Sequence, residues 1–178
     1  MIFQETKLQG AYIIELEKNV DDRGFFARTF CVNEFQEQGL SFNPVQTNLS
    51  FNEKSHTLRG MHYNESPHEE AKVVRCVRGS IFDVIIDLRD ESPTKNEWVG
   101  VELTAGNCKS LYVPKGFAHG FLTLKPETEV SYLMSDFYVP GKGRGIRWDD
   151  PFYDIHWPGE PAVISEKDNG WPYKGDKV

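Results

Sequence analysis

Short runs of β-branched and aromatic residues alternate with turn residues through the middle of the chain. The runs with the composition of strands, separated by Gly, Pro, Asn and Asp, are residues 72–77, 81–88, 98–103, 110–113, 119–124 and 129–137. Within 81–88, Phe82, Val84, Ile86 and Leu88 occupy alternate positions and share one face of a strand. Many short strands at this spacing are typical of an all-β sandwich or barrel.

The N-terminal part of the chain predicts shorter elements. Residues 11–16 and 25–30 have the composition of strands, and residues 21–24 between them predict a turn, in which Gly24 is free to adopt a positive φ. Residues 32–39 (VNEFQEQG) predict a short helix that Gly39 closes. We therefore expect an all-β fold with a few short peripheral helices.

The composition is that of one globular domain. The chain has 178 residues, of which 39% are hydrophobic and 26% are charged. Because this length is about that of one domain and no linker divides the sequence, we expect a single domain over residues 1–178.

The net charge of −7 argues against a protein that coats nucleic acid, because such a protein needs a basic face.

The three cysteines, Cys31, Cys76 and Cys108, form no CxxC pair, which argues against a disulfide framework or a thiolate zinc site. The first residues resemble no leader peptide, and no apolar run approaches the ~20 residues of a membrane span. We expect a cytoplasmic protein with no membrane partner.

Residues 57–63 bring a cation, a glycine, an imidazole and a phenol close together in sequence. His62 suits proton transfer near neutral pH, and Arg59 offers a planar fork for a phosphate or carboxylate. Strict alternation along a strand would put these two side chains on opposite faces. For both to reach one cavity the strand must shift register, and Gly60 is where a bulge is expected. Otherwise the motif is an ordinary strand with a surface arginine and a core histidine.

Residues 114–120 (PKGFAHG) resemble the second motif of the cupin superfamily, whose fold is a small jelly-roll barrel. The first cupin motif supplies clustered metal ligands, but residues 60–79 contain no H-x-H pair. The ligand types available there are His62, His68, Glu69 and Glu70. The sequence therefore shows no set of residues with the spacing that would let them bind one metal ion together. A metal-dependent cupin enzyme that uses His62 and His119 remains an alternative.

A series of further motifs narrows the resemblance and runs over almost the whole chain. In order they are DDRGFF (21–26), QTNLS (46–50), LRGMHY (58–63), AKVVRCVRG (71–79), FDVIIDLR (82–89), SPT (92–94), VPKGFAHGF (113–121), GIRWDDP (145–151) and SEKD (165–168). Together they resemble the dTDP-4-dehydrorhamnose 3,5-epimerase family of nucleotide-sugar epimerases. The resemblance implies an isomerase with a cupin-type jelly-roll barrel.

The family's substrate is a nucleotide diphosphate that carries a 4-keto-6-deoxy sugar, whose ketone acidifies the C–H bonds at C3 and C5. Epimerisation needs a base on one face of the sugar, a proton donor on the other, and a group that stabilises the enolate oxygen. The resemblance implies that His62 is the base and that Asp168 pairs with its second ring nitrogen. It implies that Lys72 stabilises the enolate and that Tyr132 donates the proton. It implies no metal and no redox cofactor.

The resemblance also implies residues that bind the nucleotide sugar. Arg23 and Arg59 would neutralise the diphosphate, which fits a local cationic pocket in an acidic protein. Gln46 and Asn48 match a nucleotide-binding stretch, and His119 matches a position that contacts substrate. For each arginine the alternative is solvated surface charge, and for His119 it is a core histidine.

Tyr138 matches the tyrosine that stacks on the nucleobase in the family. If the strand stays regular, its even spacing from Tyr132 puts both side chains on one side, together with Val130 and Met134. The alternative is a pair of packed tyrosines with exposed hydroxyls.

Three positions depart from the family pattern, and all belong to the nucleotide-binding set. The family usually has acidic residues where this chain has Arg28, Thr47 and Gly143. The departures make the nucleotide pocket more positive. We therefore predict that the proton-transfer chemistry is kept, while the nucleotide base or the sugar differs from the thymidine-rhamnose precursor.

Two further alternatives concern the reaction, and one expectation concerns assembly. The chain is a mono-epimerase if it inverts only C3 or only C5, and a non-catalytic sugar-nucleotide binding module if the pocket supports no turnover. Family members are homodimers with exchanged N-terminal strands, which leads us to expect a homodimer exchanged through Met1–Leu16. Such an exchange covers an open sheet edge.

Overall fold

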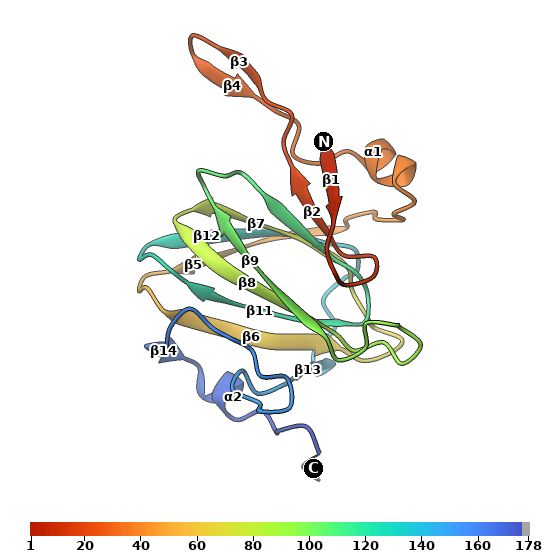
Figure 1. The fold of residues 1–178 in the computed structure, drawn as a ribbon, viewed down its shortest axis with the longest axis vertical. Coiled ribbons are helices and arrows are strands. Elements are labelled where there is room, and N and C mark those ends of the chain that lie inside the picture. The colour runs from red at the N-terminus through yellow and green to blue at the C-terminus, as the bar shows by residue number, and fades with distance from the viewer. Residues whose placement is uncertain (176–178) are drawn as a thin grey trace.

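Two antiparallel sheets lie face to face and form a jelly-roll barrel, which confirms the predicted fold class (Figure 1). The first sheet runs in the order β1 (Ile2–Glu5), β2 (Tyr12–Glu15), β10 (Ser110–Val113), β7 (Lys72–Arg78), β12 (Thr128–Met134) and β5 (Gln46–Asn52). The second runs in the order β13 (Gly143–Gly145), β6 (Thr57–Asn64), β11 (Phe117–Thr123), β8 (Ser80–Asp87) and β9 (Trp98–Thr104), and β14 (Val163–Ile164) pairs with β6 in parallel.

This computed structural model describes residues 1–175. Residues 176–178, the last three of the predicted 1–178 domain, lie outside the described part. None of the helices within residues 1–175 is long and apolar enough to cross a membrane.

Apolar side chains from both sheets meet inside the barrel. This core contains Val74, Cys76, Leu111 and Val130 from the first sheet and Ile81, Ile85, Leu103, Phe117 and Phe121 from the second. Phe82, Val84 and Ile86 share the other face of β8, as predicted, and the segment with Ile146 and Tyr153 covers them. Both faces of β8 are therefore buried, which the alternation of apolar residues alone did not predict. Fully burying each large apolar side chain stabilises the fold by ~2 kcal/mol.

The helices are short and peripheral, as predicted. Helix α1 (Val32–Glu37) ends earlier than the predicted 32–39, and Gly39 follows with a φ of +74°. Its Phe35 packs against Phe42 and Tyr112 on the outer face of the first sheet. Helix α2 (Glu166–Asn169) begins after Ser165, whose hydroxyl accepts the Asp168 N–H at 3.0 Å.

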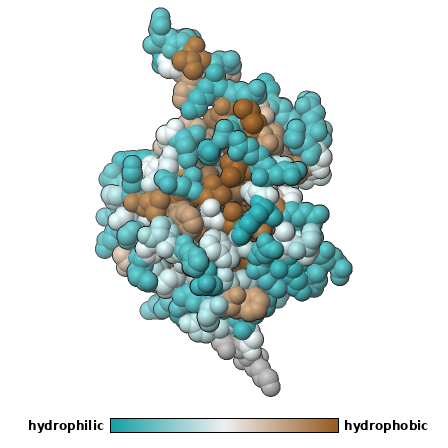
Figure 2. All heavy atoms as spheres, viewed as in Figure 1, coloured by the Kyte–Doolittle hydropathy of each residue, from teal (hydrophilic) through white to brown (hydrophobic). Residues whose placement is uncertain are grey.

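The predicted strand 25–30 is wrong. Only Gly24–Phe26 forms a strand, β4, and it pairs with β3 (Asn19–Asp21) in a hairpin that stands apart from the barrel (Figure 1). Apolar side chains on this hairpin face solvent, as the brown spheres at the top of Figure 2 show, and Phe26 is 75% exposed. Within the chain, β1 pairs with β2 and β2 pairs with β10. An exchange of Met1–Leu16 between two protomers stays a prediction.

Strand β12 ends at Met134 rather than at the predicted residue 137. Met134 pairs with Lys72 at the start of β7 and with Gln46 at the start of β5. Beyond this point both neighbouring strands have ended, so the backbone has no ladder in which to continue. Asp136 instead forms an ion pair with Lys115.

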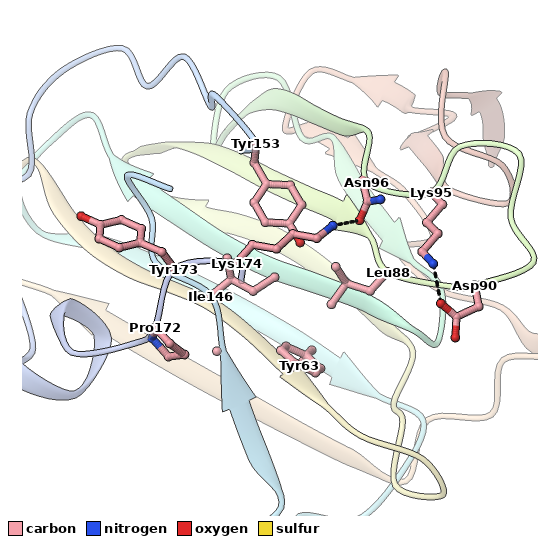
Figure 3. Close-up of a pocket in the computed structure, with 11 residues that line it drawn as sticks. Tyr63, Leu88, Asp90, Lys95, Asn96, Ile146, Tyr153, Pro172, Tyr173 and Lys174 are labelled. Carbon is pink, nitrogen blue, oxygen red and sulfur yellow. Dashed lines mark hydrogen bonds and ion pairs between the residues drawn. The ribbon is translucent and has the colours of Figure 1, made fainter. Parts of the chain in front are cut away.

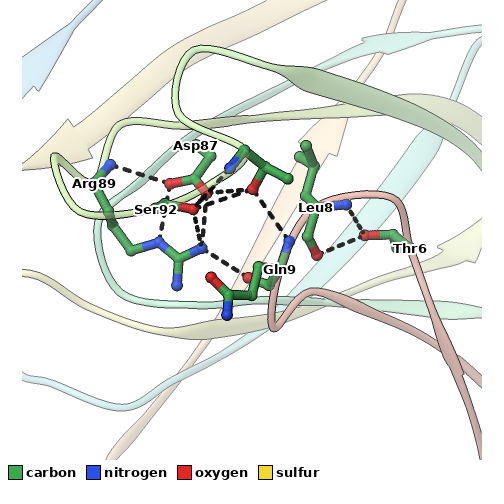
Figure 4. A network of polar contacts seen from close by, with 7 residues as sticks. Thr6, Leu8, Gln9, Asp87, Arg89 and Ser92 are labelled. Carbon is green, nitrogen blue, oxygen red and sulfur yellow. Dashed lines mark hydrogen bonds and ion pairs between the residues drawn. The ribbon is translucent and has the colours of Figure 1, made fainter.

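A polar network ties the N-terminal turn to the loop after β8 (Figure 4). The fully buried carboxylate of Asp87 accepts hydrogen bonds from the Arg89 guanidinium at 2.7 and 2.9 Å and from Thr94 at 2.8 Å. Arg89 also donates to the Gln9 carbonyl at 2.7 Å. Burial alone would raise the pKa of Asp87, but these hydrogen bonds outweigh it and lower the pKa to about 2.

Candidate active site

A cavity of about 320 Å³ opens between the two sheets, and both sheets supply its lining. From the second sheet come Arg59, His62, His119 and Phe121, and from the first come Asn48, Leu49, Ser50, Lys72, Tyr132 and Met134. Three of the four residues that the sequence analysis singled out for proton transfer, His62, Lys72 and Tyr132, therefore line one cavity from both sheets.

The predicted bulge in β6 is present and brings Arg59 and His62 to the same cavity. His119 pairs with His62 and Phe121 pairs with Arg59, so two residues of β6, Gly60 and Met61, oppose one residue of β11, Gly120. Gly60 lies inside this bulge with a φ of +139°, and a Cβ there would come within 2.5 Å of the Gly120 Cα. The close approach of the two backbones therefore requires glycine at position 60.

The His62 imidazole pairs with the Asp168 carboxylate, as predicted. The Nε2 of His62 lies 2.6 Å from the Asp168 Oδ1, although 106 positions separate the two residues in the chain. Strand β14 brings the distant residue close, because Ile164 pairs with Leu58 on β6 and α2 follows at once. The Gly60 N–H donates to the other Asp168 oxygen at 3.3 Å.

Burial acts to raise the pKa of Asp168, but the hydrogen bond and charge of His62 outweigh it, so the net pKa lies below the ordinary value. The carboxylate is therefore ionised at neutral pH. A carboxylate on one ring nitrogen fixes the tautomer of the imidazole and stabilises the imidazolium that forms when the other nitrogen takes a proton.

Tyr132 lies on β12, in the sheet opposite His62. Burial raises the pKa of its phenol above the ordinary value, and the nearby charge of Asp83 raises it further, although Ser50 and Arg59 act in the other direction. The phenol is therefore protonated at neutral pH and can donate a proton into the cavity. A base and an acid thus stand on opposite walls, which is the arrangement that inversion of a carbon centre requires.

Lys72 supplies a buried positive charge to the cavity. Its side chain is 8% exposed, and its Nζ lies 3.2 Å from the Glu70 Oε1. The sequence analysis considered Glu70 only as a metal ligand, whereas the structure makes it the partner of this lysine. A fixed ammonium in a largely buried site can stabilise a developing enolate oxygen.

The sequence analysis missed Asp83, the partner of His119. The Nε2 of His119 lies 2.7 Å from the Asp83 Oδ1, and both side chains are buried. The alternation of Phe82, Val84 and Ile86 drew attention to the other face of β8, whereas Asp83 shares its face with Ile81 and Ile85, which pack in the barrel core. His119 is therefore a buried histidine and a cavity residue at once.

Comparison with known proteins fits this geometry. A family model described as dTDP-4-dehydrorhamnose 3,5-epimerase matches residues 5–175. The chain belongs to this family. The dTDP-4-dehydrorhamnose 3,5-epimerase of Methanothermobacter thermautotrophicus is 46% identical to it over 173 residues, which cover 95% of this chain and 92% of that protein. The resemblance inferred from the motifs is confirmed, as is the isomerase class.

Solved structures of family members superimpose closely on this epimerase-family chain. A dTDP-6-deoxy-D-glucose-3,5-epimerase of Legionella pneumophila, in complex with dTDP-4-keto-L-rhamnose, has a TM-score of 0.88 and 37% identity, with coverage of 94% of this chain and 89% of that one. A 3'-monoepimerase from Streptomyces bikiniensis, in complex with dTDP-quinovose, has a TM-score of 0.87 and 31% identity, with coverage of 94% and 85%.

Besides His119, three of the predicted binding residues of this epimerase-family chain lie at or near the cavity. The Arg59 guanidinium donates to the Asn52 side chain at 2.7 Å and lines the cavity wall. Asn48 also lines the cavity and accepts a hydrogen bond from Gln46 at 3.1 Å. Gln46 itself does not line the cavity, and its hydrogen bond holds the Asn48 side chain in place.

Tyr138 does not lie beside Tyr132, and the prediction of a shared strand face is wrong. Because β12 ends at Met134, Tyr138 is outside the strand, and its side chain is 72% exposed. Its backbone N–H donates to the Gln46 side chain at 3.2 Å, which puts it at the rim rather than in the wall.

Arg23 is not brought to the cavity of its own chain. It lies on the projecting hairpin, forms an ion pair with Asp21, and its side chain is 90% exposed. The three departing positions are also outside the cavity lining: Arg28 pairs with Glu34 at 2.9 Å, Thr47 lies exposed on β5, and Gly143 begins β13.

A larger cavity of about 490 Å³ lies on the opposite face of β6, where Tyr63, Tyr153 and Lys174 line it (Figure 3). Its described lining contains no histidine, and the Lys95–Asp90 ion pair at its edge is largely exposed, so it is not the candidate site for proton transfer. Within residues 1–175, no group of three or more His, Cys, Asp or Glu side chains is arranged to hold a metal ion.

Proposed function

We propose that this chain epimerises a nucleotide-diphospho-4-keto-6-deoxy sugar, and that His62, Asp168, Lys72 and Tyr132 carry the chemistry. His62 removes the hydrogen from a carbon beside the ketone, and the electron pair of that C–H bond moves onto the C4 oxygen as an enolate. Lys72 stabilises this oxygen, and Tyr132 returns a proton to the carbon from the opposite face. The observation that carries the proposal is the His62–Asp168 pair in one wall facing the protonated phenol in the other.

Deuterium incorporation from heavy water at C3 and C5 of a nucleotide 4-keto sugar tests the proposal. We expect exchange with the unaltered chain and none with His62→Ala. His156→Ala removes an exposed histidine that is not part of the cavity lining and is the matched control. Unchanged exchange in His62→Ala would remove the base assignment. Deuterium at one carbon only would identify a mono-epimerase, and deuterium at both carbons would identify a 3,5-epimerase.

The nucleotide is a separate prediction. The relatives named above carry dTDP in their names or complexes, whereas Arg28, Thr47 and Gly143 favour a different base or sugar. Because these positions do not line the cavity, the proton transfer does not depend on them. Calorimetric titration with dTDP, UDP, CDP and GDP measures the preference directly, and tightest binding of dTDP would contradict a changed base.

We further propose a homodimer in which the β3–β4 hairpin of one protomer reaches the cavity of its partner. Two observations support it: Val20, Phe25 and Phe26 expose apolar surface that a soluble monomer rarely presents on a projecting segment, and Arg23 lies on the same hairpin away from its own cavity.

A single catalytic domain, a cytoplasmic location, and the lack of a cofactor, nucleic-acid or membrane partner remain predictions.

Subunit complementation tests the shared site. Arg23→Ala and His62→Ala chains each lack one part of every site in their own homodimers. A mixed dimer has one site with both residues intact, so refolding the two variants together should restore exchange. Failure to restore exchange, in a mixture that light scattering finds dimeric, would contradict the contribution of Arg23 across the interface.

A further inference from the structure

Trp171 packs against the backbone directly beside the His62 strand. Gly145 on β13 pairs with His62 on β6, and a Cβ added to Gly145 would lie 2.2 Å from the Trp171 Nε1 and Cε2. The indole therefore lies against the glycine, in space that any side chain at position 145 would occupy. Trp171 lies two residues after the end of α2, the helix that carries Asp168.

The indole N–H of Trp171 makes no hydrogen bond within the described part of the chain, but an acceptor, the Asp168 carboxylate, lies near it. Its nitrogen is buried and completes no hydrogen bond within residues 1–175. It nevertheless lies near enough to the Asp168 carboxylate to help lower the pKa of that group, after the larger effects of burial and of His62. A buried donor without a partner is unfavourable, so a small movement that completes this bond is favoured.

The Asp168 carboxylate needs a second strong donor if it is to keep its orientation. Oδ1 is close to His62 at 2.6 Å, but the Gly60 N–H reaches Oδ2 only at the long distance of 3.3 Å. The Lys167 ammonium lies 5.4 Å from the centre of the indole ring, where it draws electron density from the ring and makes the N–H a better donor.

We propose that Trp171 is a positioning residue for the proton-transfer pair: its indole N–H, held in place by the contact with Gly145, donates to Asp168 and keeps Oδ1 directed at His62. This inference rests on the proposed function. Trp171 does not touch the cavity, so it acts through Asp168, and its removal should slow proton abstraction without weakening substrate binding.

Trp171→Phe tests the inference, because it keeps an aromatic ring against Gly145 and removes only the N–H and the second ring. We expect kcat to fall roughly tenfold, with KM within about twofold of the unaltered chain. We also expect a larger primary isotope effect with substrate deuterated at C3 and C5, because C–H cleavage becomes more fully rate-limiting. A purely structural loss, in which part of the protein is unfolded, lowers the apparent kcat but leaves the isotope effect unchanged.

Two variants complete the experiment. Gly145→Ala keeps the indole but displaces it, and should give the same rise in isotope effect. Trp157→Phe is the matched control, because it also removes an indole N–H, which there is partly buried and donates to the Trp148 carbonyl at 2.9 Å. It should leave the isotope effect unchanged. An unchanged isotope effect in both Trp171→Phe and Gly145→Ala would overturn the inference, whereas lack of turnover by the unaltered chain would overturn the proposed function itself.

Discussion

The Asp87 network offers a stability prediction whose size follows from the structure. Replacing Asp87 by Asn keeps the shape of the side chain but removes the charge that the Arg89 guanidinium faces, and turns one acceptor into a donor. The pKa of Asp87 is about 2 in the folded chain, against an ordinary value of 3.8. A difference of about 1.8 in pKa corresponds to about 2 kcal/mol of stability at neutral pH.

The sign of the pH dependence follows from the direction of the shift. Because folding lowers the pKa, the ionised carboxylate contributes its full stability well above pH 4. This contribution falls to about half near pH 3 and is lost as the pH passes below about 2. For a chain of this size, about 2 kcal/mol corresponds to a decrease in Tm of about 4–8 °C.

Thermal unfolding followed by circular dichroism measures this difference. We expect Asp87→Asn to lower Tm by that amount at pH 7 and by a clearly smaller amount at pH 3. Asp90→Asn is the matched control, because Asp90 lies in the same loop, is largely exposed, and forms its ion pair with Lys95 rather than with Arg89. A change below 1 °C for Asp87→Asn at pH 7, or one that does not shrink in acid, would refute the reasoning.

Three further predictions concern the site and the strand that carries it. Tyr132→Phe should retain deuterium exchange but lower the rate of inversion about a hundredfold, as measured by NMR of the product sugar; normal inversion would exclude the phenol as donor. Lys72→Gln should lower kcat about a hundredfold with little change in KM, because the amide can still reach Glu70 but carries no charge; an unchanged kcat would argue against enolate stabilisation. Gly60→Ala should destabilise the fold by more than ~2 kcal/mol in urea, whereas Gly39→Ala, also at positive φ but with open space, should cost only ~1 kcal/mol; equal losses would contradict the close approach to Gly120.

Local sequence patterns predicted most of the barrel. The apolar runs 72–77, 98–103 and 110–113 lie within or match observed strands, because strands with buried faces leave a direct signal in the residues that form them. The bulge at Gly60 was also predictable, since two polar groups three positions apart can share a face only through a register shift.

The features that local patterns did not predict have a common cause. Each is set by the segments that lie beside it in space and not by the residues next to it in the chain. Tyr138 falls outside β12 because the neighbouring antiparallel strands begin only at Lys72 and Gln46, opposite Met134, which no residue near position 138 reveals. The composition of 25–30 suits a strand, yet only a short hairpin forms, because no sheet edge lies beside it. Asp168 could be placed next to His62 only through the family resemblance, since 106 positions separate them.

The late position of Asp168 in the chain has a consequence for how activity is acquired. All strands that enclose the cavity lie before residue 135, whereas the carboxylate that orients the imidazole arrives with β14 and α2 as an added edge of the second sheet. The cavity, with His62, Lys72 and Tyr132, is thus encoded before residue 135, and the group that orients the proposed base is encoded after it. A protease that cut between residues 157 and 163 and released the C-terminal segment would leave the barrel and its cavity. The His62 imidazole would then lack the carboxylate that orients it.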